Sequence, residues 1–131
     1  MADGAGGPVV APELGYRDGQ AAINWLTEVL GFSSGVVITK PGGGVAHAEL
    51  WWRNGVIFLE ELDGTEGGSS TICLVAGSAA EVDRLYAQAR AAGAPIEFEL
   101  ADTPFGSHQF AVRDPEQNVW VVGTYQPAPS T

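Results

Sequence analysis

Hydrophobic and polar positions change their spacing several times along the chain, and these changes predict two helices separated by short strands. The first helix is predicted at about 20–30, where apolar residues recur at helical spacing between Asp18, a typical capping residue, and Gly31, a typical end. The second helix is predicted after Ser78, which forms a capping box with Glu81 and precedes a second apolar stripe.

Between the helices, apolar residues alternate with polar ones or form short β-rich runs, which is typical of strands. The predicted strands cover 9–13, 35–39, 45–52, 56–61, 71–75, 96–100, 108–113 and 119–124. Each half of the chain therefore has the order strand, helix, strand, strand, strand, and the helices begin at Gly19 and Ala79, 60 positions apart. We expect an α+β fold of two tandem βαβββ modules, each with an open, concave mixed sheet and one main helix.

The predicted modules cover 9–64 and 65–126 within one domain, and we expect flexible segments at 1–8 and 127–131. One helix per sheet covers one sheet face and leaves the other face available to a ligand or partner. We therefore expect a homodimer to complete the fold, an expectation that the apolar segment 9–11 and Trp51 support.

Charge and cysteine content narrow the function classes. The chain has 6 Lys and Arg against 16 Asp and Glu, a formal net charge of −10, and its few basic residues do not cluster. Such a charge disfavours nucleic acid and suits a neutral or cationic ligand. One cysteine, Cys73, excludes an intramolecular disulfide, and no apolar run is long enough to cross a membrane. We expect a soluble, cytoplasmic protein with no nucleic-acid or membrane partner.

Several short segments together resemble a known family. They are LGYRD at 14–18, AINWL at 22–26, LGF at 30–32, HAEL at 47–50, RDPEQNVW at 113–120 and GTY at 123–125. The chain resembles the vicinal oxygen chelate superfamily over roughly residues 8–127. That superfamily includes glyoxalase I, bleomycin-resistance proteins and extradiol dioxygenases, and the likeness is greatest to its small PhnB-like bleomycin-resistance branch. The resemblance implies the fold more strongly than any one activity, because this fold hosts many functions.

The resemblance also implies four positions where the enzymes of the superfamily hold a divalent metal, one on each of four strands. In this sequence those positions hold Ala11, Phe58, Thr71 and Val121. None of these side chains is a usual metal ligand, so we expect no metal and no other cofactor. A non-standard metal site remains an alternative, and its candidate ligands are His47, Glu49, Glu60 and His108.

Most candidate ligand-binding residues are aromatic and polar residues on the uncovered sheet faces, Phe105 lies in a loop that could cover the pocket, and the sequence leaves the strand phase of His108 open. We expect no catalytic residue. The alternation in 45–52 places His47, Glu49 and Trp51 on one such face. Stacking against aromatic rings would hold a planar or hydrophobic ligand, and a glutamate could pair with a ligand cation. The full predicted set is His47, Glu49, Trp51, Phe58, Glu60, Thr71, Cys73, Phe105, His108, Phe110, Val121 and Tyr125.

These observations favour a metal-free binding protein over an enzyme. We expect it to sequester a small aromatic or hydrophobic molecule, an antibiotic being the class that the resemblance implies, in a pocket at a dimer interface. The main alternative is a glyoxalase-like lyase or isomerase, or a dioxygenase, with a non-standard metal or carboxylate site. A further alternative is a protein-interaction module.

Overall fold

The computed structural model of the protein describes residues 10–63 and 70–127. The chain divides into two compact units, Met1–Gly68 and Ser69–Thr131. In its described residues, each unit holds one open four-stranded mixed sheet and one helix, so the α+β fold of two βαβββ modules is confirmed. The module boundary predicted at 64/65 lies outside the described residues. So do the flexible ends predicted at 1–8 and 127–131, except for residue 127.

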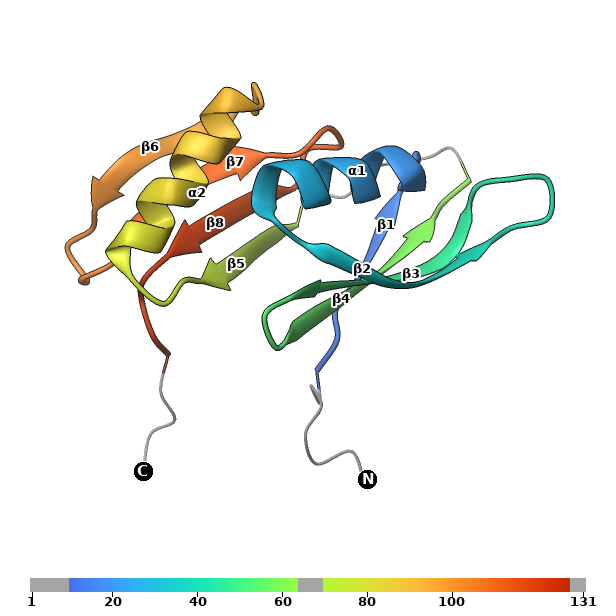
Figure 1. Ribbon diagram of the computed structural model, residues 1–131, viewed down its shortest axis with the longest axis horizontal. Helices are drawn as coiled ribbons and strands as arrows, with labels where there is room; N and C mark the ends of the chain where they lie inside the picture. The colour runs from blue at the N-terminus through green and yellow to red at the C-terminus, as the bar shows by residue number, and fades with distance from the viewer. Residues whose placement is uncertain (1–9, 64–69, 128–131) are drawn as a thin grey trace. The chain divides into compact units, whose positions relative to one another are not determined.

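Within residues 10–63, the first module contains one helix and four strands. In chain order they are β1 (Glu13–Tyr16), α1 (Gly19–Leu30), β2 (Ser33–Thr39), β3 (Val45–Trp52) and β4 (Gly55–Glu61). The strands lie in the order β1-β4-β3-β2 (Figure 1), with β1 parallel to β4 and the other neighbours antiparallel.

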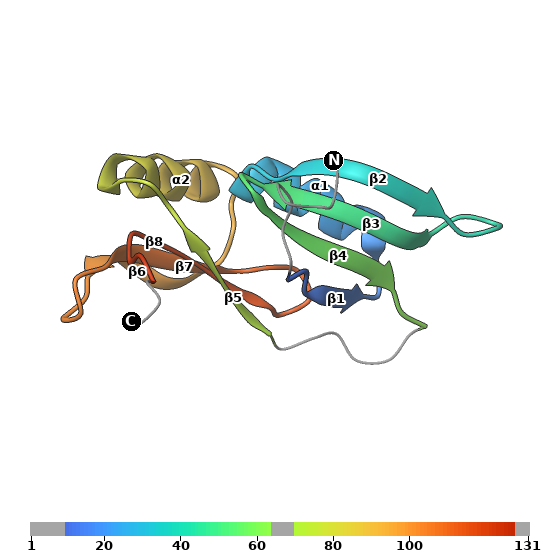
Figure 2. The same ribbon diagram turned by 90° about the horizontal axis from the view of Figure 1, so that it is seen from below.

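The second module repeats this arrangement. Its elements are β5 (Thr71–Val75), α2 (Ala79–Ala91), β6 (Ile96–Asp102), β7 (His108–Arg113) and β8 (Val119–Gly123). The strand order β5-β8-β7-β6, with β5 parallel to β8, matches that of the first module, as an internal duplication predicts. Figure 2 shows α2 on one side of its own sheet. No helix among the described residues is long and apolar enough to cross a membrane.

Both helices begin at the caps that the sequence predicts. A side-chain oxygen of Asp18 accepts a hydrogen bond from the Ala21 N–H at 3.0 Å, and Ser78 Oγ accepts one from the Glu81 N–H at 3.1 Å. The Glu81 carboxylate accepts from the N–H of Gly77 at 2.8 Å, one residue before the partner expected in a capping box. Local sequence therefore sets where each helix starts.

The first strand lies later in the chain than predicted. The sequence predicts a strand at 9–13, but β1 is Glu13–Tyr16, and its buried residues are Leu14 and Tyr16. The apolar run that suggested the earlier strand is followed by Pro12, which has no backbone N–H and weakens a strand. Ala11 therefore lies outside β1.

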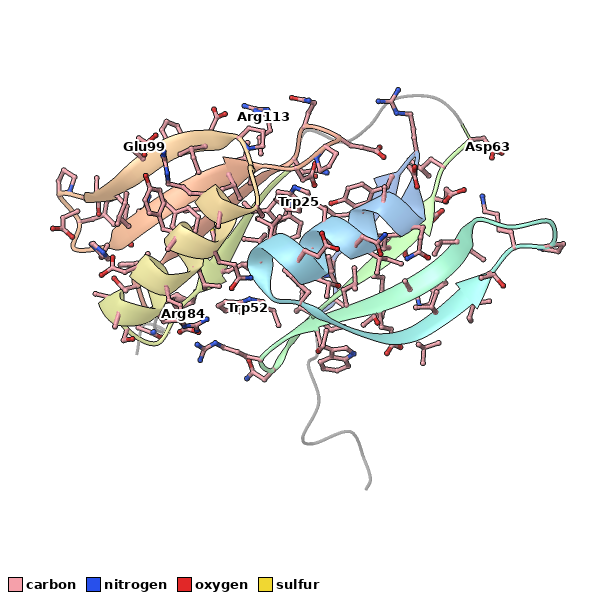
Figure 3. The ribbon with its side chains drawn as sticks, turned by 45° about the horizontal axis from the view of Figure 1, so that its top comes forward. Trp25, Trp52, Asp63, Arg84, Glu99 and Arg113 are labelled. Atoms are coloured by element: carbon pink, nitrogen blue, oxygen red, sulfur yellow. The ribbon has the colours of Figure 1, made fainter. Side chains whose placement is uncertain are left out.

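Each module packs its core between the helix and one face of the sheet. In the first module, Leu26 and Leu30 of α1 are fully buried, as is Leu50 of β3. Trp52 of β3 lies at the C-terminal end of α1 (Figure 3), where its indole N–H donates a hydrogen bond to the Leu30 carbonyl at 2.9 Å. In the second module, Trp120 of β8 is the largest fully buried side chain. These residues fill the helix-facing side and leave the opposite side of each sheet uncovered by the helix of its own module.

Candidate functional site

The sheet face opposite the helix, here called the open face, carries five predicted site residues in the first module. His47, Glu49 and Trp51 of β3 alternate with buried residues, and Phe58 and Glu60 of β4 alternate in the same way. The His47 ring meets the Phe58 ring edge-on, with centroids 5.0 Å apart. These residues form a half-buried polar and aromatic surface rather than an enclosed core.

Glu13 joins this surface although it is absent from the predicted set. It is the β1 partner of Phe58 in the parallel ladder, and its carboxyl is hydrogen-bonded to that of Glu60. This hydrogen bond, together with the negative charge of Glu60, raises the pKa of Glu13, and the nearby His47 opposes the shift. The period-two pattern of Leu14 and Tyr16 is the sequence signal that would have placed Glu13 on the open face.

The residues present do not fit the four-ligand metal site that the resemblance implies. Ala11 lies outside β1, and the β1 residue beside Phe58 is Glu13. The implied positions in the other module hold Thr71 and Val121, which are poor ligands for a divalent metal. Among residues 10–63 and 70–127, no group of three or more His, Cys, Asp or Glu side chains is placed to hold a metal ion.

A pocket of about 320 Å³ lies in the second module. Open-face residues of β5 and β8 contribute to it, and so do the loop before β7 and the segment after β8. Among the described residues, the lining is largely apolar and contains no charged side chain. The lining residues are Cys73, Leu74, Val75, Phe105, Ser107, Gln109, Val121, Gly123, Tyr125 and Pro127.

Two aromatic side chains line this pocket and also reach solvent. Phe105 is 61% exposed and Tyr125 is 54% exposed, and their rings meet edge-on with centroids 5.9 Å apart. An exposed aromatic pair beside an apolar pocket offers a flat ligand both stacking and edge contacts. Phe105, Tyr125, Cys73 and Val121 are thus the four predicted site residues that the structure brings together in one pocket.

Three other predicted residues of the second module lie elsewhere. Thr71 is exposed but does not line the pocket. Phe110 is 1% exposed and packs edge-on against Tyr86 of α2, with ring centroids 5.3 Å apart, so it faces the helix. His108 also faces α2, because its Nε2 lies 2.7 Å from a carboxylate oxygen of Asp83.

Phe110 and His108, predicted as ligand-binding residues, therefore lie on the helix-facing side of the sheet, and the composition of β7 explains why the sequence does not show this. Phe110, Ala111 and Val112 are all buried, so this strand lacks the apolar–polar alternation that would reveal its phase. The strand register determines the face on which Phe110 lies, because Phe110 pairs with the buried Val122 of β8.

Sequence reasoning missed six of the residues that line the pocket, namely Leu74, Val75, Ser107, Gln109, Gly123 and Pro127. Gln109 pairs with Gly123 across β7 and β8, so both lie on the open face of the sheet. Gly123 falls on the same alternation as Val121 and Tyr125, which was the available signal for it. For Ser107, in the loop before β7, the sequence holds no comparable signal.

Comparisons with known proteins agree with this geometry. Residues 9–122 match the family described as Glyoxalase/Bleomycin resistance protein/Dioxygenase superfamily. No curated protein gives a significant match to the sequence.

Two solved structures illustrate the likeness. TioX from Micromonospora sp. ML1 is 26% identical, with a TM-score of 0.80, over 92% of this chain and 100% of TioX. Lactoylglutathione lyase from Agrobacterium tumefaciens is 25% identical, with a TM-score of 0.66, over 88% of this chain and 93% of the lyase. The family description covers proteins of several kinds, so the architecture alone does not fix an activity.

Proposed function

Because the chain belongs to the glyoxalase/bleomycin resistance protein/dioxygenase superfamily, we propose that it is a small-molecule-binding protein that holds an aromatic or hydrophobic molecule without changing it chemically. The binding site of this proposal is the pocket in the second module. The molecule is an antibiotic in the fullest form of the proposal, for which the bleomycin-resistance members of the superfamily are the precedent.

The observation that carries the proposal is the chemistry of the pocket lining. Small-molecule sites are typically cavities of about 300–1,000 Å³ with apolar walls and few polar groups. The pocket here, at about 320 Å³, lies at the lower end of that range. Burial of a planar ring against Val121, Phe105 and Tyr125 supplies affinity through the hydrophobic effect and aromatic contacts. Among residues 10–63 and 70–127, no charged group lines the pocket to serve as an acid, a base or a metal ligand.

Sequestration requires affinity and enough protein to match the ligand, but no catalytic group. A protein that binds a toxic molecule tightly lowers its free concentration in proportion to the amount of protein present. The proposal includes a homodimer, because the edge strand β2 exposes Val36 and Ile38, each at 52%.

The single cysteine makes the pocket directly testable. Cys73 is exposed and lines the pocket, so a thiol reagent such as DTNB reacts at one known place in the chain. Aromatic antibiotics are first screened by thermal shift, since a ligand that binds the native state raises the unfolding midpoint. A compound that binds in this pocket is expected to slow the reaction of Cys73 with DTNB.

Aromatic variants then locate the contact. Phe105→Ala and Tyr125→Ala are each expected to weaken binding by about 10-fold, the loss of one aromatic contact. Phe98→Ala is the matched control, because Phe98 is 63% exposed on β6 but lies outside the pocket. Stoichiometric Zn, Ni, Mn or Fe that is lost on His47→Ala, or turnover of a compound by the pure protein, would contradict the proposal.

A further inference from the structure

Gly123, Ser107 and Gln109 form one part of the pocket wall at β7 and β8, here called the recess, in which the two side chains lie close to the glycine backbone. A Cβ atom at this position would lie 2.7 Å from Ser107 Oγ, 2.9 Å from Gln109 Cβ and 3.1 Å from Gln109 Oε1. Gly123 is not among the glycines with positive φ, so its backbone does not require glycine. Glycine is needed because the side chains of Ser107 and Gln109 occupy the surrounding space.

Ser107 brings an unsatisfied hydroxyl to this recess. The residue is 1% exposed, and its Oγ is the one buried side-chain nitrogen or oxygen in the described parts of the chain that has no hydrogen-bond partner. Its backbone is held on both sides, because its N–H donates to Thr103 Oγ1 at 2.9 Å and its carbonyl accepts from the Thr103 N–H at 2.8 Å. Buried hydroxyls are nearly always paired, so an unpaired one that lines a pocket points to a ligand atom as its partner.

The recess constrains the polar group of that ligand. Ser107 Oγ carries a hydrogen that it can donate, whereas Gln109 Oε1 can only accept. A ligand hydroxyl satisfies both, since it accepts from the serine and donates to the amide oxygen. An ether or carbonyl oxygen would face Gln109 Oε1 as a second acceptor.

The lining also constrains the charge of the ligand. The chain has a net charge of −10, yet no Asp, Glu, Lys, Arg or His in the part of the chain that the structure describes lines the pocket. A charge buried there would lose its hydration without gaining a counter-ion. The electrostatic attraction of a cation that the overall charge suggests therefore does not extend to the pocket lining.

We infer that the pocket selects an uncharged aromatic molecule that bears a hydroxyl group on its ring, with the hydroxyl directed to Ser107 and Gln109 over Gly123. This inference rests on the proposed function and adds the ligand class. The aromatic pair of Phe105 and Tyr125 contacts the ring, and Ser107 and Gln109 of the recess form hydrogen bonds with the hydroxyl.

The test uses the full chain and four matched probes: 2-naphthol, naphthalene, 2-methoxynaphthalene and 2-naphthoate. Titration calorimetry gives the affinities, and protection of Cys73 from DTNB reports whether each probe occupies the pocket. The wild-type protein is expected to bind 2-naphthol about 10-fold more tightly than naphthalene or 2-methoxynaphthalene, the effect of satisfying a buried polar group. The charged 2-naphthoate is expected to bind most weakly.

Variants test whether the recess causes the preference for 2-naphthol over naphthalene. Ser107→Ala is expected to abolish the preference for 2-naphthol and to leave the affinity for naphthalene unchanged. Ser34→Ala, an exposed serine on β2 of the first module, is the matched control and is expected to retain the preference. Gly123→Ala fills the recess and is expected to act like Ser107→Ala; if it does not fold, Ser107→Ala decides the question.

The outcomes separate the inference from the proposed function. If naphthalene and 2-naphthol bind equally and both protect Cys73, the inference fails while the binding function stands. The inference also fails if 2-naphthol is preferred and Ser107→Ala keeps that preference. If none of the probes and none of the screened antibiotics protects Cys73, the binding function and the inference both fail.

Discussion

At the scale of single residues, Asp114 organises the turn between β7 and β8. Its carboxylate accepts four hydrogen bonds, from the backbone N–H groups of Glu116 and Asn118, the Asn118 side-chain amide and the indole N–H of Trp120, at 2.9–3.1 Å. Asp114 is 2% exposed and Trp120 is fully buried. The turn between β7 and β8 therefore also anchors Trp120, the largest fully buried side chain described in the second module.

Replacing Asp114 is expected to be severely destabilising. Asp114→Ala leaves several buried donors unpaired, so we expect the free energy of unfolding to fall by about 3 kcal/mol or more. Asp63→Ala is the control, since Asp63 is exposed in the first module (Figure 3), and its effect is expected to stay within about 0.5 kcal/mol. Urea denaturation measures both, and a loss below about 1 kcal/mol for Asp114→Ala would show that water replaces these bonds at little cost.

At the scale of elements, His108 links α2 to the sheet of the second module. Its Nε2 lies 2.7 Å from Asp83 of α2, and its Nδ1 lies 2.8 Å from Asp102 of β6. The hydrogen bonds to Asp83 and Asp102 raise the pKa of His108 above its ordinary value of 6.5, although partial burial opposes the shift. The residue first considered as a pocket or metal group thus contributes to helix packing.

This contact predicts a pH dependence of stability. A histidine whose pKa is raised on folding stabilises the native state fully below its unfolded pKa and loses that contribution as pH rises through the folded pKa. We therefore expect wild-type stability to decline as pH rises above about 6.5, with the histidine transition upward of that value. His108→Gln is expected to remove this part of the profile.

The other histidine provides the control for this measurement. His47→Gln changes a residue on the open face of the first module and is expected to keep the pH dependence. Chemical denaturation at pH 6.0 and pH 8.5 compares the three proteins. A wild-type profile unchanged by His108→Gln would exclude His108 as the source of the dependence.

At the scale of the whole molecule, exposed apolar residues on the edge strand of the first sheet form the surface on which we expect a second copy of the chain to bind. Among the strands that the structure describes, β2 pairs only with β3, and its Val36, Val37 and Ile38 are between 40% and 52% exposed. An uncovered apolar edge strand is a site for association. Sedimentation velocity at micromolar concentration is expected to give twice the chain mass of 13.6 kDa.

An edge variant tests the same expectation. Ile38→Lys places a charge on β2 and is expected to shift the protein toward the monomer, because a desolvated lysine without a partner opposes association. Phe98→Ala on β6 serves as the comparison variant. A wild-type protein that sediments as a monomer would contradict the proposed homodimer.

Local sequence alone determined the helices, most strands and the repeat. The caps Asp18 and Ser78 place the helix starts correctly, and β3, β5 and β7 have the predicted bounds. These features depend on neighbouring residues, because a cap bonds an amide two or three positions away and alternation sets the faces of a strand. Sequence also placed Cys73, Val121, Phe105 and Tyr125 among the candidates that line the pocket.

The faces on which some site residues lie, and the convergence of residues at Gly123, were decided only by the tertiary structure, because these features depend on how the strands pair. Pairing with β4 places Glu13 beside Phe58, and the β7–β8 register turns Phe110 to the helix side and Gln109 to the pocket side. The recess at Gly123 exists because Ser107 and Gln109, distant in sequence from Gly123, converge on it. A residue's neighbours along the chain carry no information about such convergence when its strand is apolar on both faces, as β7 is over Phe110 to Val112.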